Sequence, residues 1–217
     1  MITKIISTSF FISMFVVQAF SQNSQSIKIS NRDSVRSYKF RVSTPWLSFA
    51  NFGEERTNVH MYELHFKYNL DSKNILGIKF ATWRLFQPMG ILWSDGLLEK
   101  IDSQSEFYPG YLRETGLGVS YQRMLWKGLF ATVEILPQLK TYLDENKNKI
   151  GNGFKLYTSY HIGYHITMFK GRMFLEPQIH CQYWPIDTNT PQAFKVIDDR
   201  WRNYFLFEPN LYIGVKF

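Results

Sequence analysis

The sequence predicts an all-β fold, an eight-stranded antiparallel up-and-down transmembrane β-barrel. Three observations predict it: eight segments in which apolar and polar residues alternate, connections that alternate between short and long, and many aromatic residues without a long apolar run. Phe, Tyr and Trp make up 18% of the 217 residues, yet the mean hydropathy is only -0.24. After the N-terminal stretch no apolar run approaches the roughly 20 residues of a membrane-spanning helix, which excludes a helical membrane protein.

Residues 1–21 are expected to form a secretory signal peptide. Lys4 precedes an apolar run, and Ala19-Phe20-Ser21 fits a small-x-small cleavage site. A retained anchor helix is the alternative, but the run is short and interrupted by polar residues. Residues 22–41 are polar and are expected to be a periplasmic segment that precedes the barrel at residues 42–217. The only cysteine, Cys181, leaves no intramolecular disulfide.

The eight predicted strands have the length that a tilted transmembrane strand needs, about 9 to 11 residues or somewhat more. They are residues 42–52, 59–70, 74–85, 111–124, 129–143, 155–169, 173–184 and 204–217. Residues 71–73, 126–128 and 170–171 form short connections, residues 86–110, 144–154 and 185–203 form long ones, and residues 53–58 are intermediate. Short turns are periplasmic and long loops external in such barrels, so both termini are expected in the periplasm.

The last predicted strand shows the alternation most clearly. One face carries Phe205, Phe207, Pro209, Leu211, Ile213, Val215 and Phe217, and the other carries Glu208, Asn210, Tyr212, Gly214 and Lys216. A polar face recurs in nearly every other strand, which favours lipid outside the sheet over a soluble core. Prolines within the strands remove a ladder donor and are expected to mark bulges; these are Pro45, Pro137, Pro177 and Pro209.

Over residues 42–217 the chain resembles the small eight-stranded outer-membrane barrels of the OmpX-like and OmpA-transmembrane-domain-like group. The most specific element is the terminal stretch Leu211-Tyr212-Ile213-Gly214-Val215-Lys216-Phe217. The resemblance implies a place in the outer membrane of a Gram-negative bacterium, among outer-membrane lipid and lipopolysaccharide. It also implies that Tyr212 and Phe217 belong to the signal that the barrel-assembly machinery recognises during biogenesis.

Polar side chains of inward parity are expected to fill the lumen as one network. Its members are Glu63, His65, Lys67, Glu114, Glu134, Lys140, His161, His165, Glu176, His180 and Glu208. A two-residue turn at residues 170–171 places His165 opposite Glu176 and His161 opposite His180. A three-residue turn at residues 126–128, with Gly128 in the left-handed conformation, places Lys140 opposite Glu114 and Glu134 opposite Ser120.

Some of these residues are of types that carry out chemistry in other proteins. His161 and His180 are too few to hold a metal, so no metal and no cofactor are expected. Ser159, His165 and Glu176 are the residue types of an acyl-transfer triad, but six residues along one strand separate Ser159 from His165 by about 20 Å. A catalytic triad made of Ser159, His161 and an unidentified carboxylate remains an open alternative. We expect no catalysis; a barrel enzyme that modifies lipid A or phospholipid is the alternative, and a narrow channel is the second.

Two features near the external end point to contacts outside the barrel. Arg84 and Arg113 have outward parity there and are candidates for lipid A phosphates, the alternative being that both are merely solvated. Within residues 86–110, the apolar stretches 91–93 and 97–98 suggest a short helix over the barrel mouth or a partner's surface. Thr190 and Pro191 suggest the N-cap and first turn of a second short helix near residues 192–197.

The formal charge of +7 comes from cations dispersed along the chain without a nucleic-acid-binding motif, so a nucleic-acid partner is excluded. The sequence therefore predicts a non-catalytic outer-membrane barrel. It is expected to act through its external loops as a structural protein, a surface-interaction protein or an accessory subunit of a larger outer-membrane complex.

Overall fold

The computed structural model describes residues 38–49, 51, 54–89 and 106–217. The strands are β1 (Phe40–Pro45), β2 (Tyr62–Asn69), β3 (Asn74–Leu85), β4 (Tyr111–Trp126), β5 (Leu129–Leu143), β6 (Lys149–Tyr164), β7 (Ile166–Met168), β8 (Met173–Thr188) and β9 (Tyr204–Lys216). Two short helices accompany them, η1 (Trp46–Phe49) and α2 (Gln192–Asp198). Across the described ranges, no helix combines the length and the apolar character that crossing a membrane requires.

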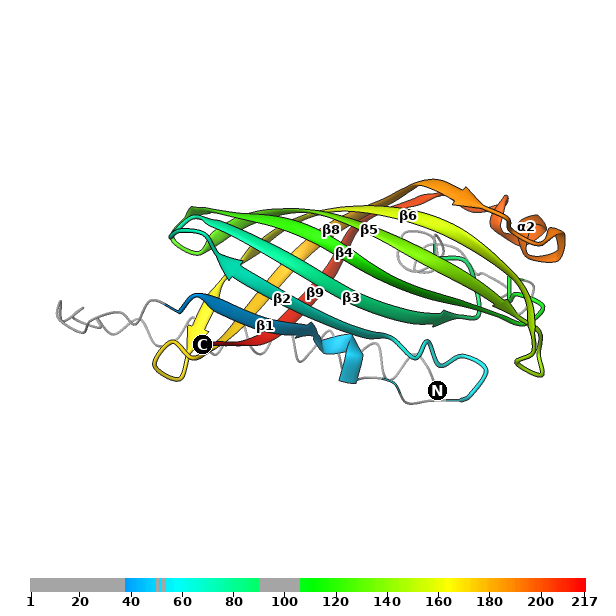
Figure 1. Cartoon of the computed structure of the whole chain (residues 1–217), viewed down its shortest axis with the longest axis horizontal. Helices are drawn as coiled ribbons and strands as arrows, with labels where there is room; N and C mark the ends of the chain where they lie inside the picture. The colour runs from blue at the N-terminus through cyan, green and yellow to red at the C-terminus, as the bar shows by residue number, and fades with distance from the viewer. Residues whose placement is uncertain (1–37, 50, 52–53, 90–105) are drawn as a thin grey trace. The chain divides into compact units, whose positions relative to one another are not determined.

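The strands close into a ring of eight, which confirms the predicted fold class. β6 and β7 are interrupted only at His165 and both pair with β8, so together they make one barrel strand. All neighbours are antiparallel, and the ring closes where β1 pairs with β9, with Val42 opposite Val215. Figure 1 shows the consecutive strands running up and down around the barrel. The β2–β3, β4–β5 and β7–β8 turns lie at the same end as the C-terminus, and α2 lies at the other end.

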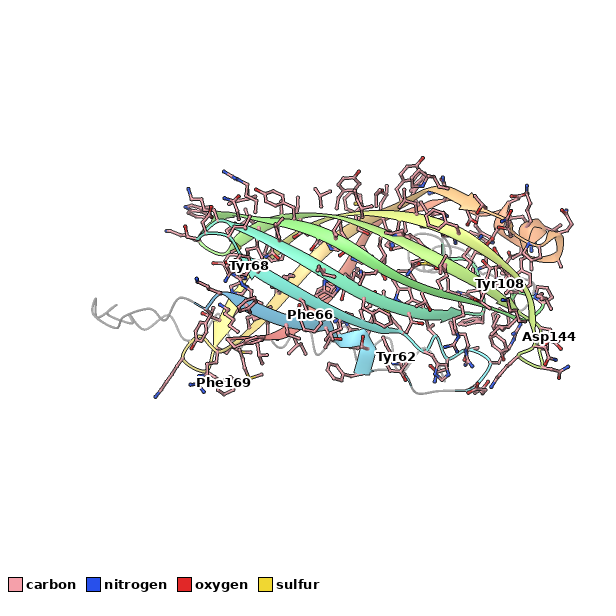
Figure 2. All side chains as sticks on the ribbon, viewed as in Figure 1. Tyr62, Phe66, Tyr68, Tyr108, Asp144 and Phe169 are labelled. Atoms are coloured by element: carbon pink, nitrogen blue, oxygen red, sulfur yellow. The ribbon has the colours of Figure 1, made fainter. Side chains whose placement is uncertain are left out.

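The barrel is apolar outside and polar inside. In β2, Phe66 is 52% exposed on the outer face, whereas its inward neighbour His65 is only 4% exposed. Figure 2 shows side chains standing outward along β2, with Tyr62, Phe66 and Tyr68 labelled. The other exposed apolar residues of the strands include Leu76, Ile78, Phe80, Leu117, Val119, Val133, Ile135, Tyr160, Ile162 and Ile179. This is the arrangement of transmembrane β-barrels and the reverse of a soluble sandwich.

The β4–β5 turn differs from its predicted form but gives the predicted register. It has two residues, Lys127 (φ 44°) and Gly128 (φ 101°), rather than three. Trp126, predicted to be in the turn, pairs with Leu129, and the extra residue of β4 is Leu125, which lies in an irregularity between Met124 and Trp126. One bulged residue shifts the register as much as one extra turn residue does.

Several predicted boundaries are wrong at the strand ends. The first strand was expected to reach residue 52, but β1 ends at Pro45 and continues into η1; β1 also begins before residue 42, at Phe40. The expected loop at residues 144–154 is a tight turn at residues 144–148, since β6 starts at Lys149. β8 extends to Thr188, beyond the expected end at residue 184. The outermost residues of β8 are exposed on both faces, so they show no alternation from which a strand could be inferred.

The prolines do not each mark a bulge. Pro137 pairs with Leu156, and Pro177 pairs with Leu211, in an unbroken register. A proline removes one ladder donor but adds no residue, so the register need not shift.

A bulge in β9 changes the face on which one aromatic residue lies. Leu206 and Phe207 together occupy the space opposite Cys181, and Phe207 has a φ of 60°. The extra residue turns Phe205 inward, where it is 3% exposed, while Phe207 is 72% exposed. The prediction that Phe205 shares the outer face with Phe207 is therefore wrong.

Candidate functional site

The lumen contains ion pairs that link residues from different strands. Nearest the turns, the carboxylate of Glu176 (β8) accepts hydrogen bonds from Lys67 Nζ at 2.9 Å and from Gln122 Nε2 at 3.2 Å. His165 Nδ1 lies 2.8 Å from the same carboxylate, as the predicted pairing requires, and Arg41 Nη1 lies at 3.8 Å. Glu176 is fully buried. One carboxylate thus connects β1, β2, β4 and the break between β6 and β7.

A second group lies in the middle of the lumen. Lys79 Nζ bridges two carboxylates, 3.1 Å from Glu63 and 2.8 Å from Glu134. Glu63 also accepts from Trp83 Nε1 at 3.0 Å and lies 3.3 Å from His65 Nε2. Tyr212 points inward and donates its hydroxyl to Glu63 at 3.3 Å.

The two histidines of the predicted pair are adjacent. His161 is opposite His180 in the ladder, and their ring centroids are 5.1 Å apart. His180 Nε2 lies 2.7 Å from Glu208. Within the described ranges, no group of three or more His, Cys, Asp or Glu residues is arranged to hold a metal ion.

A third group lies toward the end of the barrel that carries α2. Glu114 is 3.0 Å from Lys155 Nζ and accepts a hydrogen bond from the Tyr157 hydroxyl at 2.6 Å. Lys140 stands opposite Glu114 in the ladder, as predicted, but its ammonium group pairs with Asp187 and donates to Thr190 Oγ1 at 2.9 Å. The ladder fixes which Cα atoms are opposite, whereas a long side chain reaches beyond its ladder partner.

A cluster of buried apolar side chains, most of them aromatic and called the aromatic cluster, fills the end of the barrel interior that carries α2. Its buried members are Ala81, Trp83, Leu85, Tyr108, Leu112, Leu136, Tyr142, Tyr157, Trp184, Phe194 and Phe205. Phe194 comes from α2 and is fully buried, with its ring 4.9 Å from those of Tyr108 and Tyr142. Near it the Tyr108 hydroxyl donates to Asp198, and burial raises the pKa of both groups. The segment between β8 and β9 is thus attached to the barrel by an apolar side chain and a buried polar contact.

One cavity found in the middle of the lumen is small. It has a volume of about 10 Å³ and is lined by residues that include His161, Ser120 and Thr132. That volume is about one water molecule. A much larger pocket of about 700 Å³ opens at the mouth that carries α2, between this helix and the ends of β8 and β9.

Arg84 and Arg113 are in different environments. Both belong to the outer face and are opposite each other in the β3–β4 ladder. Arg84, however, is only 4% exposed, because the segment between β1 and β2 covers it. Its guanidinium donates to Glu55 Oε1 at 2.7 Å and to the carbonyl of Asn58 at 3.2 Å. Arg84 is therefore not free for a lipid phosphate, whereas Arg113 is exposed.

Glu55 holds this segment on the barrel. Besides Arg84, it accepts a hydrogen bond from Lys147 Nζ at 2.8 Å, which joins it to the β5–β6 turn. The hydrogen bonds from Arg84 and Lys147 lower the pKa of Glu55 to about 2. Arg56 follows and lies over the Tyr111 ring at 4.8 Å, as Arg84 does.

The predicted helix between β8 and β9 is present as α2, but its predicted cap is wrong. Pro191 occupies the N-cap position, with no side-chain cap hydrogen bond, and Thr190 is one residue earlier. Thr190 instead accepts hydrogen bonds from Lys140 and from the Tyr142 hydroxyl. The other predicted short helix, at residues 91–98, lies outside the described residues.

The Phe217 ring is exposed and stacks on Phe40, with centroids 5.9 Å apart. Four charged residues of the lumen network were not predicted as members, namely Arg41, Lys79, Lys155 and Asp187. Lys79 has inward parity and could have been found from its position two residues before Ala81, but Arg41 was assigned to the preceding polar segment.

The triad considered from sequence is not assembled. His165 and Glu176 are in contact, but Ser159 is opposite Glu134 on one side and Gln182 on the other. Ser159 remains about 20 Å along the strand from His165. These residues are part of the lumen filling.

The closed ring, the apolar exterior and the ion-paired lumen define the class of protein, a small eight-stranded β-barrel of the outer-membrane type. Among solved structures, the chain is similar to Ail, the attachment invasion locus protein of Yersinia pestis, in complex with the heparin analogue sucrose octasulfate. The identity is 8% and the TM-score 0.40, over 82% of this chain and 94% of that one. It is also similar to Neisserial surface protein A (NspA), with 9% identity and a TM-score of 0.40 over the same shares. No protein-family model and no curated protein matches the sequence.

Proposed function

We propose that this chain works in the bacterial outer membrane as a non-catalytic barrel that presents its external loops to a partner, as a surface-interaction protein or an accessory subunit. The observation that carries the proposal is the filled lumen. Ion pairs occupy its length, and the aromatic cluster occupies its outer part. Other molecules therefore meet this barrel at its exposed loops and its outer face.

The outer membrane is supported by the surface of the strands. Exposed apolar side chains surround the barrel, and an exposed aromatic cluster of Phe40, Tyr68 and Phe217 lies at the end with the short turns. Aromatic residues are enriched where a barrel meets the membrane interface. We place this end, and with it both termini, in the periplasm, and we take Tyr212 and Phe217 as part of the assembly signal.

Lipopolysaccharide is a natural neighbour of the outer face. Arg113 is exposed there beside Thr141, its ladder partner in β5. A guanidinium in this position suits a lipid A phosphate. Arg84 is excluded from this role by its contacts with Glu55 and Asn58.

A lipid-modifying enzyme and a channel are supported less well. The Ser159 hydroxyl and the His165 imidazole are too far apart to exchange a proton, and both point into the lumen rather than toward lipid. A channel needs a continuous path, whereas the cavity of the middle lumen measures about 10 Å³.

The test is a native pull-down of the full-length tagged protein from detergent-solubilised outer membranes, followed by mass spectrometry. We expect a stoichiometric partner whose capture is reduced by Lys195→Glu on α2 and retained in Lys73→Glu on the β2–β3 turn, both exposed sites. Recovery of the protein alone would speak against an accessory subunit. Loss of capture only in Lys73→Glu would contradict the assignment of the function to the external side.

A further inference from the structure

The pocket at the external mouth has the size of a small-molecule site and a lining that is more polar than apolar. Its volume of about 700 Å³ is within the range of ligand pockets, about 300 to 1,000 Å³. It is lined by the outer end of β8, by α2, by the residues leading into β9, by Lys155 of β6 and by Pro88 and Met89 after β3. Figure 1 shows these segments together at the end of the barrel opposite the short turns.

Three aromatic rings line the pocket and are held by contacts of their own. Trp184 packs against Tyr157 and Phe205, with ring centroids 5.6 Å and 6.1 Å apart. Trp201 Nε1 donates to Glu106 Oε2 at 2.6 Å, and the guanidinium of Arg202 lies over the Tyr204 ring, 5.8 Å from its centroid. Rings fixed before binding lose little conformational entropy when a ligand stacks on them.

The charges around the pocket are balanced. Three carboxylates line it, Asp187, Asp198 and Asp199, together with three cations, Lys155, Lys195 and Arg202. The innermost pair is already satisfied, since Lys155 Nζ lies 3.2 Å from Asp187 and 3.0 Å from Glu114. A strongly anionic or cationic ligand would meet groups of its own sign here, and an apolar ligand would leave polar groups without hydrogen bonds.

We propose that this pocket is a binding site for a neutral saccharide. A sugar ring has an apolar face that stacks on an aromatic side chain, and hydroxyl groups that donate to carboxylates and accept from cations. Asp199 and Arg202 lie near the opening and offer the acceptor and the donor, and Tyr204 offers the ring. The proposal rests on the proposed function, because it assumes that the mouth faces the cell exterior, and it adds the ligand class.

The experiment uses the full-length protein in detergent micelles on an array of neutral and of sulfated or carboxylated oligosaccharides. The affinity of the strongest neutral ligand is then measured by calorimetry. We expect binding to weaken at least tenfold in Tyr204→Ala and in Asp199→Ala. Tyr204→Phe keeps the ring and should bind within threefold of the wild type.

Glu145→Ala in the β5–β6 turn and Lys149→Ala at the start of β6, both exposed sites, are the matched controls and should leave the affinity unchanged. Circular dichroism shows whether each variant keeps its strands. The proposal is overturned if the array shows no neutral saccharide, if only anionic sugars bind, or if Tyr204→Ala and Asp199→Ala bind as the wild type does. Capture of a partner protein that persists without saccharide binding would overturn this inference alone and leave the proposed function standing.

Discussion

Single residues stabilise the lumen by neutralising one another away from water. Glu176 is surrounded by Lys67, His165, Gln122 and Arg41, which come from separate parts of the ring. A buried charge is tolerated only where partners and hydrogen bonds compensate for its lost hydration. The network therefore holds strands together that are far apart in the sequence.

Replacing Glu176 by Ala should destabilise the barrel by about 3 to 5 kcal/mol, because Lys67 and Arg41 would stay buried without a counter-charge. The free energy of unfolding in urea, measured with the protein in lipid vesicles, tests this. Glu145→Ala removes an exposed carboxylate and should change stability by less than about 0.5 kcal/mol. Equal effects of the two substitutions would show that the lumen pairs carry no special weight.

The contact of Glu55 with the barrel should depend on pH. Its pKa is lowered from 4.5 to about 2 by Arg84 and then Lys147, so the contact is fully present above pH 4.5 and is lost as the pH falls through about 2. A carbon-13 NMR titration of the Glu55 carboxyl should give a midpoint near 2.

Lys147→Ala removes one of the two side-chain donors to Glu55 and should raise that midpoint toward 4.5. Lys149→Ala is the control and should leave it in place. An ordinary midpoint in the wild-type protein would mean that the segment between β1 and β2 does not rest on Arg84 in solution.

At the scale of elements, the turns fix the register and hence the lumen pairs. Gly128 has a φ of 101°, and a Cβ there would lie 3.0 Å from the carbonyl oxygen of His165. Gly128→Ala should therefore cost about 1 to 3 kcal/mol of unfolding free energy. Lys127→Asn at the preceding position, φ 44°, should be neutral or slightly stabilising, since Asn-Gly is favoured in this type of turn. Both values come from urea unfolding, and a neutral Gly128→Ala would contradict the strained geometry.

Phe194 is the fully buried side chain by which α2 packs on the barrel. Phe194→Ala should release the segment between β8 and β9, because the ring is fully buried between Tyr108 and Tyr142. We expect faster hydrogen exchange at residues 189–203 and little change in the ladder amides. Val196→Ala on the exposed side of the same helix is the control. If both variants exchange alike, Phe194 is not the anchor.

For the whole molecule, the filled lumen predicts the absence of ion conduction. The purified protein in planar bilayers should give no stable conductance steps, because an interior cavity of about 10 Å³ cannot hold a file of hydrated ions. Phe194→Ala should also remain silent, since the ion pairs below the mouth are unchanged. Regular steps from the wild-type protein would contradict the closed lumen and favour a channel.

Local pattern was enough to predict much of the barrel. Alternation and loop length gave eight strands, and the turns gave the pairs of His161 with His180 and of Glu134 with Ser120. These predictions succeed because the alternation of side chains along a strand and the register of a hairpin both depend on residues that are close in sequence. The predictions failed where alternation stops, at the end of β1 and in the outer part of β8.

The sequence by itself determined the fold class, the two faces of the strands and most members of the lumen network. The tertiary structure decided what depends on distant segments. Lys140 pairs with Asp187 because its side chain extends past its ladder partner; Arg84 is covered because Glu55 and Lys147 hold another segment over it. The bulge at Phe207 turns Phe205 inward, and the mouth pocket is lined by residues of β6, β8, α2 and β9 together with Pro88 and Met89. Contacts between residues far apart in sequence follow from closure of the ring, which no local period encodes.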